Sequence, residues 1–257
     1  SISEVMQECF GNPSSTHAFG RTAKTHIETA RKEIAKQINA APQEIIFTSG
    51  GTESDNMILH CAVKDLGVKR IISSPIEHHA VLHAMEALEQ LFGISTAYVK
   101  TDDKGVVDLG DLEALLKSSK EKTLVSLMHV NNEIGNVLDL EVVGELCHQY
   151  GSYFHTDAVQ GIGHFTFDME TLPVDFLSAA AHKFHGPKGI GFSFVRKNSG
   201  LQSFIHGGAQ ERGLRAGTES VHNIVGMNKA LKLAYENLEV ERQKVLDVKN
   251  HFIDQIT

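Results

Sequence analysis

Hydrophobic residues along the chain follow two repeating patterns, one with a helical period and one of short apolar runs. Between residues 28 and 38 the apolar positions Ile34 and Ile38 fall on the same side as Ile27. A spacing of three to four residues is typical of an amphipathic helix, so we predict a helix that buries this side. Short apolar runs bounded by Gly, Asn, Asp or Ser predict buried strands instead.

The two patterns alternate from residue 28 to the end of the chain. Strands are predicted at 44–49, 70–74, 96–100, 123–130, 153–156, 176–179 and 191–195. Further helices are predicted from about Thr52, over 78–91, 108–117 and 140–150, and over 221–256 as one long or broken helix. Strands joined through helices form a mainly parallel sheet that is covered on both faces. We therefore predict an α/β protein built as a three-layer α/β/α sandwich.

Composition narrows the possible partners. The chain has 257 residues, 41% of them hydrophobic, and a net charge of -8, which argues against a nucleic-acid partner because such proteins need a basic surface. No apolar run reaches the roughly 18–20 residues of a membrane span. The three cysteines (Cys9, Cys61 and Cys147) are far apart and predict neither a disulfide framework nor a thiolate metal site. We expect a cytoplasmic protein with no membrane partner.

The polar residues that could carry chemistry follow predicted strands. Gly51 with Thr52, Asn132, Asp157 and Lys183 each come after a strand. In open parallel sheets, ligands bind outside the carboxyl ends of the strands. We therefore expect these residues to share one site.

A site that binds pyridoxal phosphate requires three groups: an amine, an acid and a turn that binds the phosphate. Its aldehyde forms a Schiff base with a lysine, here Lys183, and its ring nitrogen pairs with an acid, here Asp157. Gln160 lies three residues after Asp157 and could reach the same ring. Taken singly, each residue has an ordinary interpretation. Lys183 could be a surface lysine in a turn, Asp157 a helix N-cap and Gln160 a solvated helix residue.

Phosphate binding is predicted at Gly50-Gly51-Thr52, where a strand turns into a helix. Free backbone N–H groups and the helix dipole bind anions there, and the threonine hydroxyl adds a donor. A plain strand-to-helix turn is the alternative interpretation, because the sequence matches neither a Walker loop nor G-x-G-x-x-G.

A histidine and an asparagine complete the candidate residues. His78 begins a predicted helix and could lie on the cofactor ring and transfer protons near its reactive carbon. His79 and His83 nearby suggest a metal site, but adjacent histidines on a helix point about 100° apart and no carboxylate completes a known motif. We therefore predict no metal. Asn132 could bind the ring hydroxyl or a substrate carboxylate, or simply belong to a turn.

A glycine-rich basic stretch, residues 206–218, is too long and polar for a core element. It could cover the mouth of the site or reach a partner subunit. The alternative is a mobile surface loop.

Together these segments resemble the NifS/IscS type of cysteine desulfurase, in the class V aminotransferase group of fold-type I pyridoxal phosphate enzymes. The matching segments, in the family's order, are residues 11–15, 47–56, 77–78, 128–135, 155–160, 182–191 and 207–218. The resemblance implies that the sandwich is the large cofactor domain of such an enzyme. It also implies pyridoxal 5'-phosphate as cofactor, L-cysteine as substrate and a homodimer with shared active sites.

Roles for single residues follow from the resemblance. Lys183 is the implied attachment lysine, Asp157 the partner of the ring nitrogen and His78 the stacking base. Further contacts are implied as follows: Gln160 and Asn132 to the ring oxygen, Gly51, Thr52 and His182 to the phosphate, and Thr218 to the phosphate of the neighbouring subunit.

Two features depart from the family pattern. Ala180 stands where the family has a phosphate-binding serine, and backbone donors or Ser178 are the candidates to replace it. The family also uses a cysteine on a mobile C-terminal loop as the persulfide carrier, and none of the three cysteines has such a context. We therefore expect a cofactor domain at 1–225, followed by a helix at 226–257 that leads toward a small domain largely absent from this chain.

The expected activity is release of sulfur from L-cysteine to give L-alanine and a persulfide, for a sulfur-acceptor protein in iron–sulfur cluster assembly. Because the persulfide cysteine is missing, little turnover is expected from this polypeptide alone. Selenocysteine lyase or another class V aminotransferase is an alternative with the same cofactor. A non-catalytic protein that keeps the fold is an alternative of a different class.

Overall fold

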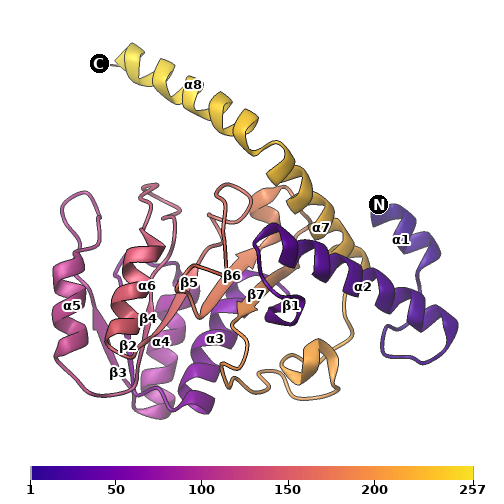
Figure 1. Ribbon diagram of the computed structural model, residues 1–257, viewed down its shortest axis with the longest axis horizontal. Coiled ribbons are helices and arrows are strands. Elements are labelled where there is room, and N and C mark those ends of the chain that lie inside the picture. The colour runs from indigo at the N-terminus through magenta and orange to yellow at the C-terminus, as the bar shows by residue number, and fades with distance from the viewer. Residues whose placement is uncertain (1, 257) are drawn as a thin grey trace.

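The computed structural model describes residues 2–256 and consists of helices that alternate with strands (Figure 1). The strands are β1 (Ile45–Thr48), β2 (Arg70–Ser73), β3 (Ser95–Tyr98), β4 (Thr123–Ser126), β5 (Tyr153–Asp157), β6 (Phe176–Ala180) and β7 (Gly191–Val195). The helices are α1 (Ile2–Glu8), α2 (Ala18–Gln37), α3 (Gly51–Leu66), α4 (His79–Phe92), α5 (Leu109–Lys117), α6 (Leu140–Gln149), α7 (Val221–Glu236) and α8 (Leu238–Ile256). Short 3-10 turns are η1 (Pro42–Glu44), η2 (Ala181–Phe184) and η3 (Gln210–Gly213).

The strands form one seven-stranded sheet in the order β1-β7-β6-β5-β4-β2-β3. The pairs β3–β2, β2–β4, β4–β5 and β5–β6 are parallel, whereas β7 runs antiparallel to both of its neighbours. The predicted mainly parallel α/β fold is confirmed. The parallel strands bring their carboxyl ends to the same edge of the sheet, where the candidate residues follow.

Both faces of the sheet are covered by helices, as Figure 1 shows. Neighbouring strand residues point to opposite faces, so Leu124 packs in the core under α3 and α4 while Val125 packs in the core under α2, α6 and α7. The helix predicted at 28–38 belongs to the longer α2, which begins at Ala18, and the predicted apolar residues Ile27, Ile34 and Ile38 are completely buried. Because each face of the sheet packs against helices in its own hydrophobic core, the protein has three layers, with the sheet in the middle.

Several boundaries differ from prediction. The strand predicted at 123–130 ends at Ser126, because Val130 instead bridges to Val137 in a separate turn. For residues 221–256, predicted as one long or broken helix, the broken alternative holds: α7 is capped at Asn237, and α8 beyond it has no buried residue. In Figure 1 α8 projects away from the body of the molecule. Among residues 2–256, no helix combines the length and apolarity that crossing a membrane requires.

Candidate active site

A cavity of about 260 Å³ lies at the carboxyl ends of the central strands. Its walls are Gly51, Thr52, Asp55, His78, Met128, Asn132, Asp157, Val159, Gln160, Ala180, His182 and Lys183. The structure thus brings together all of the candidate residues named from the sequence except Thr218.

The phosphate turn is built by two glycines between β1 and α3. Gly50 has a φ of 151°, which favours glycine, and it precedes α3 without any side-chain cap on the helix. A Cβ on Gly51 would lie only 2.6 Å from Cγ2 of Val159, so this close packing also requires glycine. The uncapped first turn of α3, with Thr52, therefore faces the cavity as an anion-binding helix end.

Asp157 is the last residue of β5 and is 5% exposed. Its Oδ1 accepts a hydrogen bond of 2.9 Å from the backbone N–H of Val159. No helix begins there, so the N-cap interpretation is wrong. Burial raises the pKa of Asp157, and the Val159 N–H, His78 and Lys183 oppose that rise. The Asp157 carboxylate could therefore pair with a positively charged group of a ligand in the cavity.

His78 is the N-cap of α4. Its Nδ1 accepts a hydrogen bond of 3.1 Å from the backbone N–H of Ala80, which fixes the ring at the start of the helix. The His79 and His83 rings stack on each other 4.9 Å apart along α4, and neither lines the cavity.

Lys183 lies in η2, the tight turn that follows β6. Its backbone oxygen accepts a hydrogen bond of 3.0 Å from Nε2 of His164, and the turn ends at His185 in the left-handed conformation, with φ of 63°. The neighbouring His182 has a lowered pKa, first because of burial and then because of Lys183 and Lys188. The turn therefore presents an amine and an imidazole side by side at the cavity.

Asp55 lines the cavity as well, although the sequence analysis did not single it out. It is 1% exposed and lies on α3, four residues after Gly51. That spacing places Asp55 on the same face of the helix as Gly51, among apolar residues such as Leu59. The sequence signal that could have identified Asp55 is an acidic residue at a buried position of an amphipathic helix.

The hydroxyl missing at Ala180 is not replaced by Ser178. Ser178 is fully buried, does not line the cavity, and its Oγ lies 3.1 Å from Nε2 of His155. Asn131 is likewise committed, because its Oδ1 accepts the N–H groups of Glu133 and Ile134 in a turn. Asn131 therefore stabilises the turn, whereas the neighbouring Asn132 lines the cavity.

The loop 206–218 is anchored to the body of the protein. Glu211 is 3% exposed and makes a bidentate pair with Arg31 of α2, at 2.7 and 2.8 Å. The same carboxylate accepts the backbone N–H of Phe47 in β1 at 2.8 Å. Arg215 pairs with Glu53 at 2.7 Å, next to the start of α3. Thr218, at the end of the loop, lines a separate cavity of about 100 Å³, so its implied role toward a partner stays a prediction.

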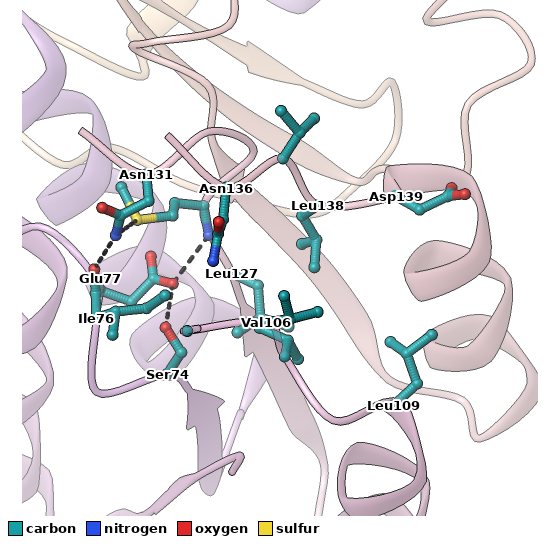
Figure 2. A pocket seen from close by; sticks show the side chains of 14 residues that line it. Ser74, Ile76, Glu77, Val106, Leu109, Leu127, Asn131, Asn136, Leu138 and Asp139 are labelled. Carbon is teal, nitrogen blue, oxygen red and sulfur yellow. Dashed lines mark hydrogen bonds between the residues drawn. The ribbon is translucent and has the colours of Figure 1, made fainter. Parts of the chain in front are cut away.

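A second cavity of about 260 Å³ shares Met128 with the first, and Figure 2 shows the side chains that line it. Its walls are mostly apolar and, within residues 2–256, include no lysine, arginine or histidine. Figure 2 shows the Glu77 carboxyl at its base, held by the Ser74 hydroxyl and the Met128 N–H at 2.8 and 3.0 Å. Burial raises the pKa of Glu77 to about 8. Among the described residues, this cavity therefore has no amine in its walls to attach an aldehyde.

Comparison with known proteins places the fold and the cavity in a family. The model of the aminotransferase class-V family matches residues 1–254. The chain belongs to the class-V aminotransferase family. Proteins of this family depend on pyridoxal phosphate, in agreement with the cofactor expected from the sequence.

Relatives within the family carry sulfur-related names. The chain is 46% identical over 253 residues to a protein of Dictyoglomus turgidum named cysteine desulfurase IscS, covering 98% of this chain and 64% of that relative's length. A solved NifS-like protein superposes with a TM-score of 0.94 at 40% identity, over 98% of this chain and 70% of its own. A structure titled SspA in complex with cysteine gives 0.84 at 36% identity, over 90% and 67%. The chain thus spans just under two thirds of the curated relative's length.

Proposed function

We propose that this chain is the cofactor-binding part of a pyridoxal phosphate-dependent cysteine desulfurase. The observation that carries the proposal is the single cavity lined by Lys183, Asp157, His78 and the start of α3. The names of the similar proteins, which include cysteine desulfurases and a structure with cysteine, support the choice of substrate.

The residues present fit the cofactor at each of its groups. The buried Asp157 carboxylate suits a protonated ring nitrogen, and the uncapped turn at Gly51 and Thr52 suits a phosphate. Lys183 provides the amine for covalent attachment. When bound, pyridoxal phosphate supplies an aldehyde and an electron-accepting ring.

Each side chain then has a task in the proposed reaction. Lys183 would hold the cofactor, and its amine would move a proton at the α-carbon of L-cysteine. His78 would cover the ring and transfer protons beside it, while Gln160 and Asn132 would hydrogen-bond the ring oxygen. His182 would join Gly51 and Thr52 in holding the phosphate.

Sulfur transfer needs a thiolate that attacks the substrate sulfur, leaving L-alanine as product. None of the three cysteines, all in the described part of the chain, lines the cavity. Burial raises the pKa of Cys61 and of Cys147 to about 12, which keeps these thiols unreactive. We therefore assign the attacking thiolate to a residue outside residues 2–256 or to an added thiol.

The proposal includes a division of the chain into a cofactor domain at 1–225 and a helical segment at 226–257. The lack of buried residues on α8 supports a helical segment that leaves the body, whereas α7 stays buried against the body as far as Leu231. A homodimer with Thr218 reaching the partner's phosphate, and a sulfur-acceptor protein, belong to the same proposal.

The test is covalent attachment followed by turnover. The purified chain is mixed with pyridoxal phosphate, reduced with borohydride and digested, and mass spectrometry should find the adduct on Lys183. Alanine release is then compared with cysteine, selenocysteine and alanine as substrates and dithiothreitol as thiol. An adduct at another lysine, or none, would refute the proposal, and preference for selenocysteine would assign a lyase instead.

A further inference from the structure

A second buried carboxyl shares the cavity with Asp157 and has no task in the proposed reaction. Asp55 enters from α3 and Asp157 from the end of β5, with exposures of 1% and 5%. Two carboxyls that interact in a buried site lose their protons in separate steps, so one of them keeps its proton. The question is which of the two carries the charge.

The groups around Asp55 do not neutralise a charge on it. Its Oδ1 has no hydrogen-bond partner within residues 2–256 and lies 3.6 Å from Nε2 of His155. His155 is fully buried between the hydroxyls of Ser126 and Ser178, at 2.8 and 3.1 Å, and burial lowers its pKa to about 3. A neutral imidazole carries no positive charge to balance a carboxylate on Asp55.

The cations of the site act on Asp157 instead. His78 and Lys183 lower the pKa of Asp157, opposing its burial. The pKa of Asp55 lies well above its usual value because of burial first, then Asp157 and Glu77, and only the Ser178 hydroxyl opposes this. The negative charge of the pair therefore settles on Asp157 and the proton on Asp55.

We propose that Asp55 is a positioning residue for the reaction, a neutral carboxylic acid beside the neutral His155 that leaves Asp157 as the single negative charge facing the cofactor ring. One carboxylate matches the one positive charge of a protonated ring nitrogen. The role of Asp157 toward the ring rests on the proposed function, whereas the proton on Asp55 does not.

The proton is tested directly by infrared spectroscopy of the chain without cofactor at pH 7. The difference spectrum of wild type minus Asp55→Asn should contain the C=O band of one protonated carboxylic acid. The exposed Asp103→Asn control should lack that band. A carboxylate band in place of the acid band for Asp55 overturns the proposal. Failure of cofactor attachment would refute the proposed function and leave this result intact.

The positioning role is tested with pyridoxal phosphate as the probe, by its visible absorption during titration. Asp55→Leu, which cannot hydrogen-bond, should weaken binding about tenfold and shift the pH midpoint of the absorption change. Asp55→Asn, a neutral hydrogen-bonding mimic of the acid, should restore both. Wild-type behaviour of the leucine variant, or equal loss in the asparagine variant, overturns the proposal.

A third variant keeps the test decisive if the leucine variant does not fold, which melting of the cofactor-free chain reveals. Ser178→Ala removes the hydroxyl that faces Asp55 and retains the acid. Because this hydroxyl favours the ionised form of Asp55, its removal should leave the acid band of Asp55 in the infrared spectrum and change the affinity for pyridoxal phosphate by less than about threefold. Loss of the acid band in this variant overturns the proposal.

Discussion

Two cavities of about 260 Å³ share Met128 in their walls, and they differ in whether basic side chains line them. Lys183, His78 and His182 line the candidate active site together with buried acids, whereas the walls of the second cavity are mostly apolar around Glu77. Burial raises the pKa of the acids in both places. Only for Asp157 do neighbouring basic residues oppose this rise in pKa. The candidate active site can therefore hold a carboxylate at Asp157, whereas Glu77 in the second cavity stays a neutral acid.

The largest expected effect is loss of the amine on the charged side. Lys183→Ala should lower alanine release more than about 10⁴-fold, the upper range of acid–base catalysis, because the covalent link is lost too. Borohydride labelling should disappear with it. The matched control is Lys188→Ala, an exposed lysine outside the cavity, and a similar loss there would mean that position 183 is not special.

The second largest effect is expected from removal of the negative charge on Asp157. Asp157→Asn keeps the shape of the side chain and the acceptor for the Val159 N–H, but not the carboxylate. We expect a loss of turnover on the order of 10²–10³-fold, as for removal of one preorganised electrostatic contact. Steady-state rates of alanine release check this, and a loss below tenfold would contradict the pairing of Asp157 with the ring.

For the second cavity, the expected effect is a pH dependence of stability that comes from Glu77 and does not involve the cofactor. The pKa of Glu77 is raised by burial from 4.5 to about 8, so the folded protein keeps a proton that the unfolded chain loses. The unfolding free energy should therefore fall as pH rises from about 4.5 to 8, at about 1.4 kcal/mol per pKa unit at most. Glu77→Gln, which retains the contacts to Ser74 and Met128, should flatten this fall.

Urea unfolding at pH 5.5 and pH 8 measures that slope. The control is Glu145→Gln, because Glu145 is an exposed acid on α6 and should leave the slope unchanged. A glutamine variant with the wild-type slope would show that Glu77 ionises freely in the folded protein.

The smallest expected effect tests whether the second cavity matters to the first. Val106 lines only the second cavity and is 53% exposed. Val106→Ser should change cofactor affinity by less than about twofold and stability by about 0.5 kcal/mol or less. A larger change in affinity would mean that the two cavities are coupled through Met128.

The sheet and the edge that holds the site could be predicted because both depend on local sequence patterns. Apolar runs identified each strand of the sheet, and polar residues directly after them located Asp157 and Lys183. Asp55 could not be assigned in the same way, because a single acid within a helix has no local partner in the sequence. Its significance comes from residues of β5 and β6 that folding places beside it.

The anchoring of the 206–218 loop was beyond sequence reasoning for a similar cause. Arg31 and Glu211 are separated by 180 positions, and neither neighbourhood indicates a pairing. The sequence suggested a loop over the mouth of the site or toward a partner subunit, with a mobile surface loop as the alternative, and it gave no sign of the buried bidentate pair that anchors the loop. Long-range charge pairs are set by topology, which the alternation of strands and helices defines only coarsely.

That same pair has a consequence for how this chain can vary among its relatives. Leaving one partner of a buried ion pair alone costs about 3–5 kcal/mol, while replacing both together can be nearly neutral. Substitutions at positions 31 and 211 are therefore tolerated mainly when they occur jointly. An alignment of the family should reveal correlated substitution between a helix on the outer layer and a loop at the opposite end of the sequence.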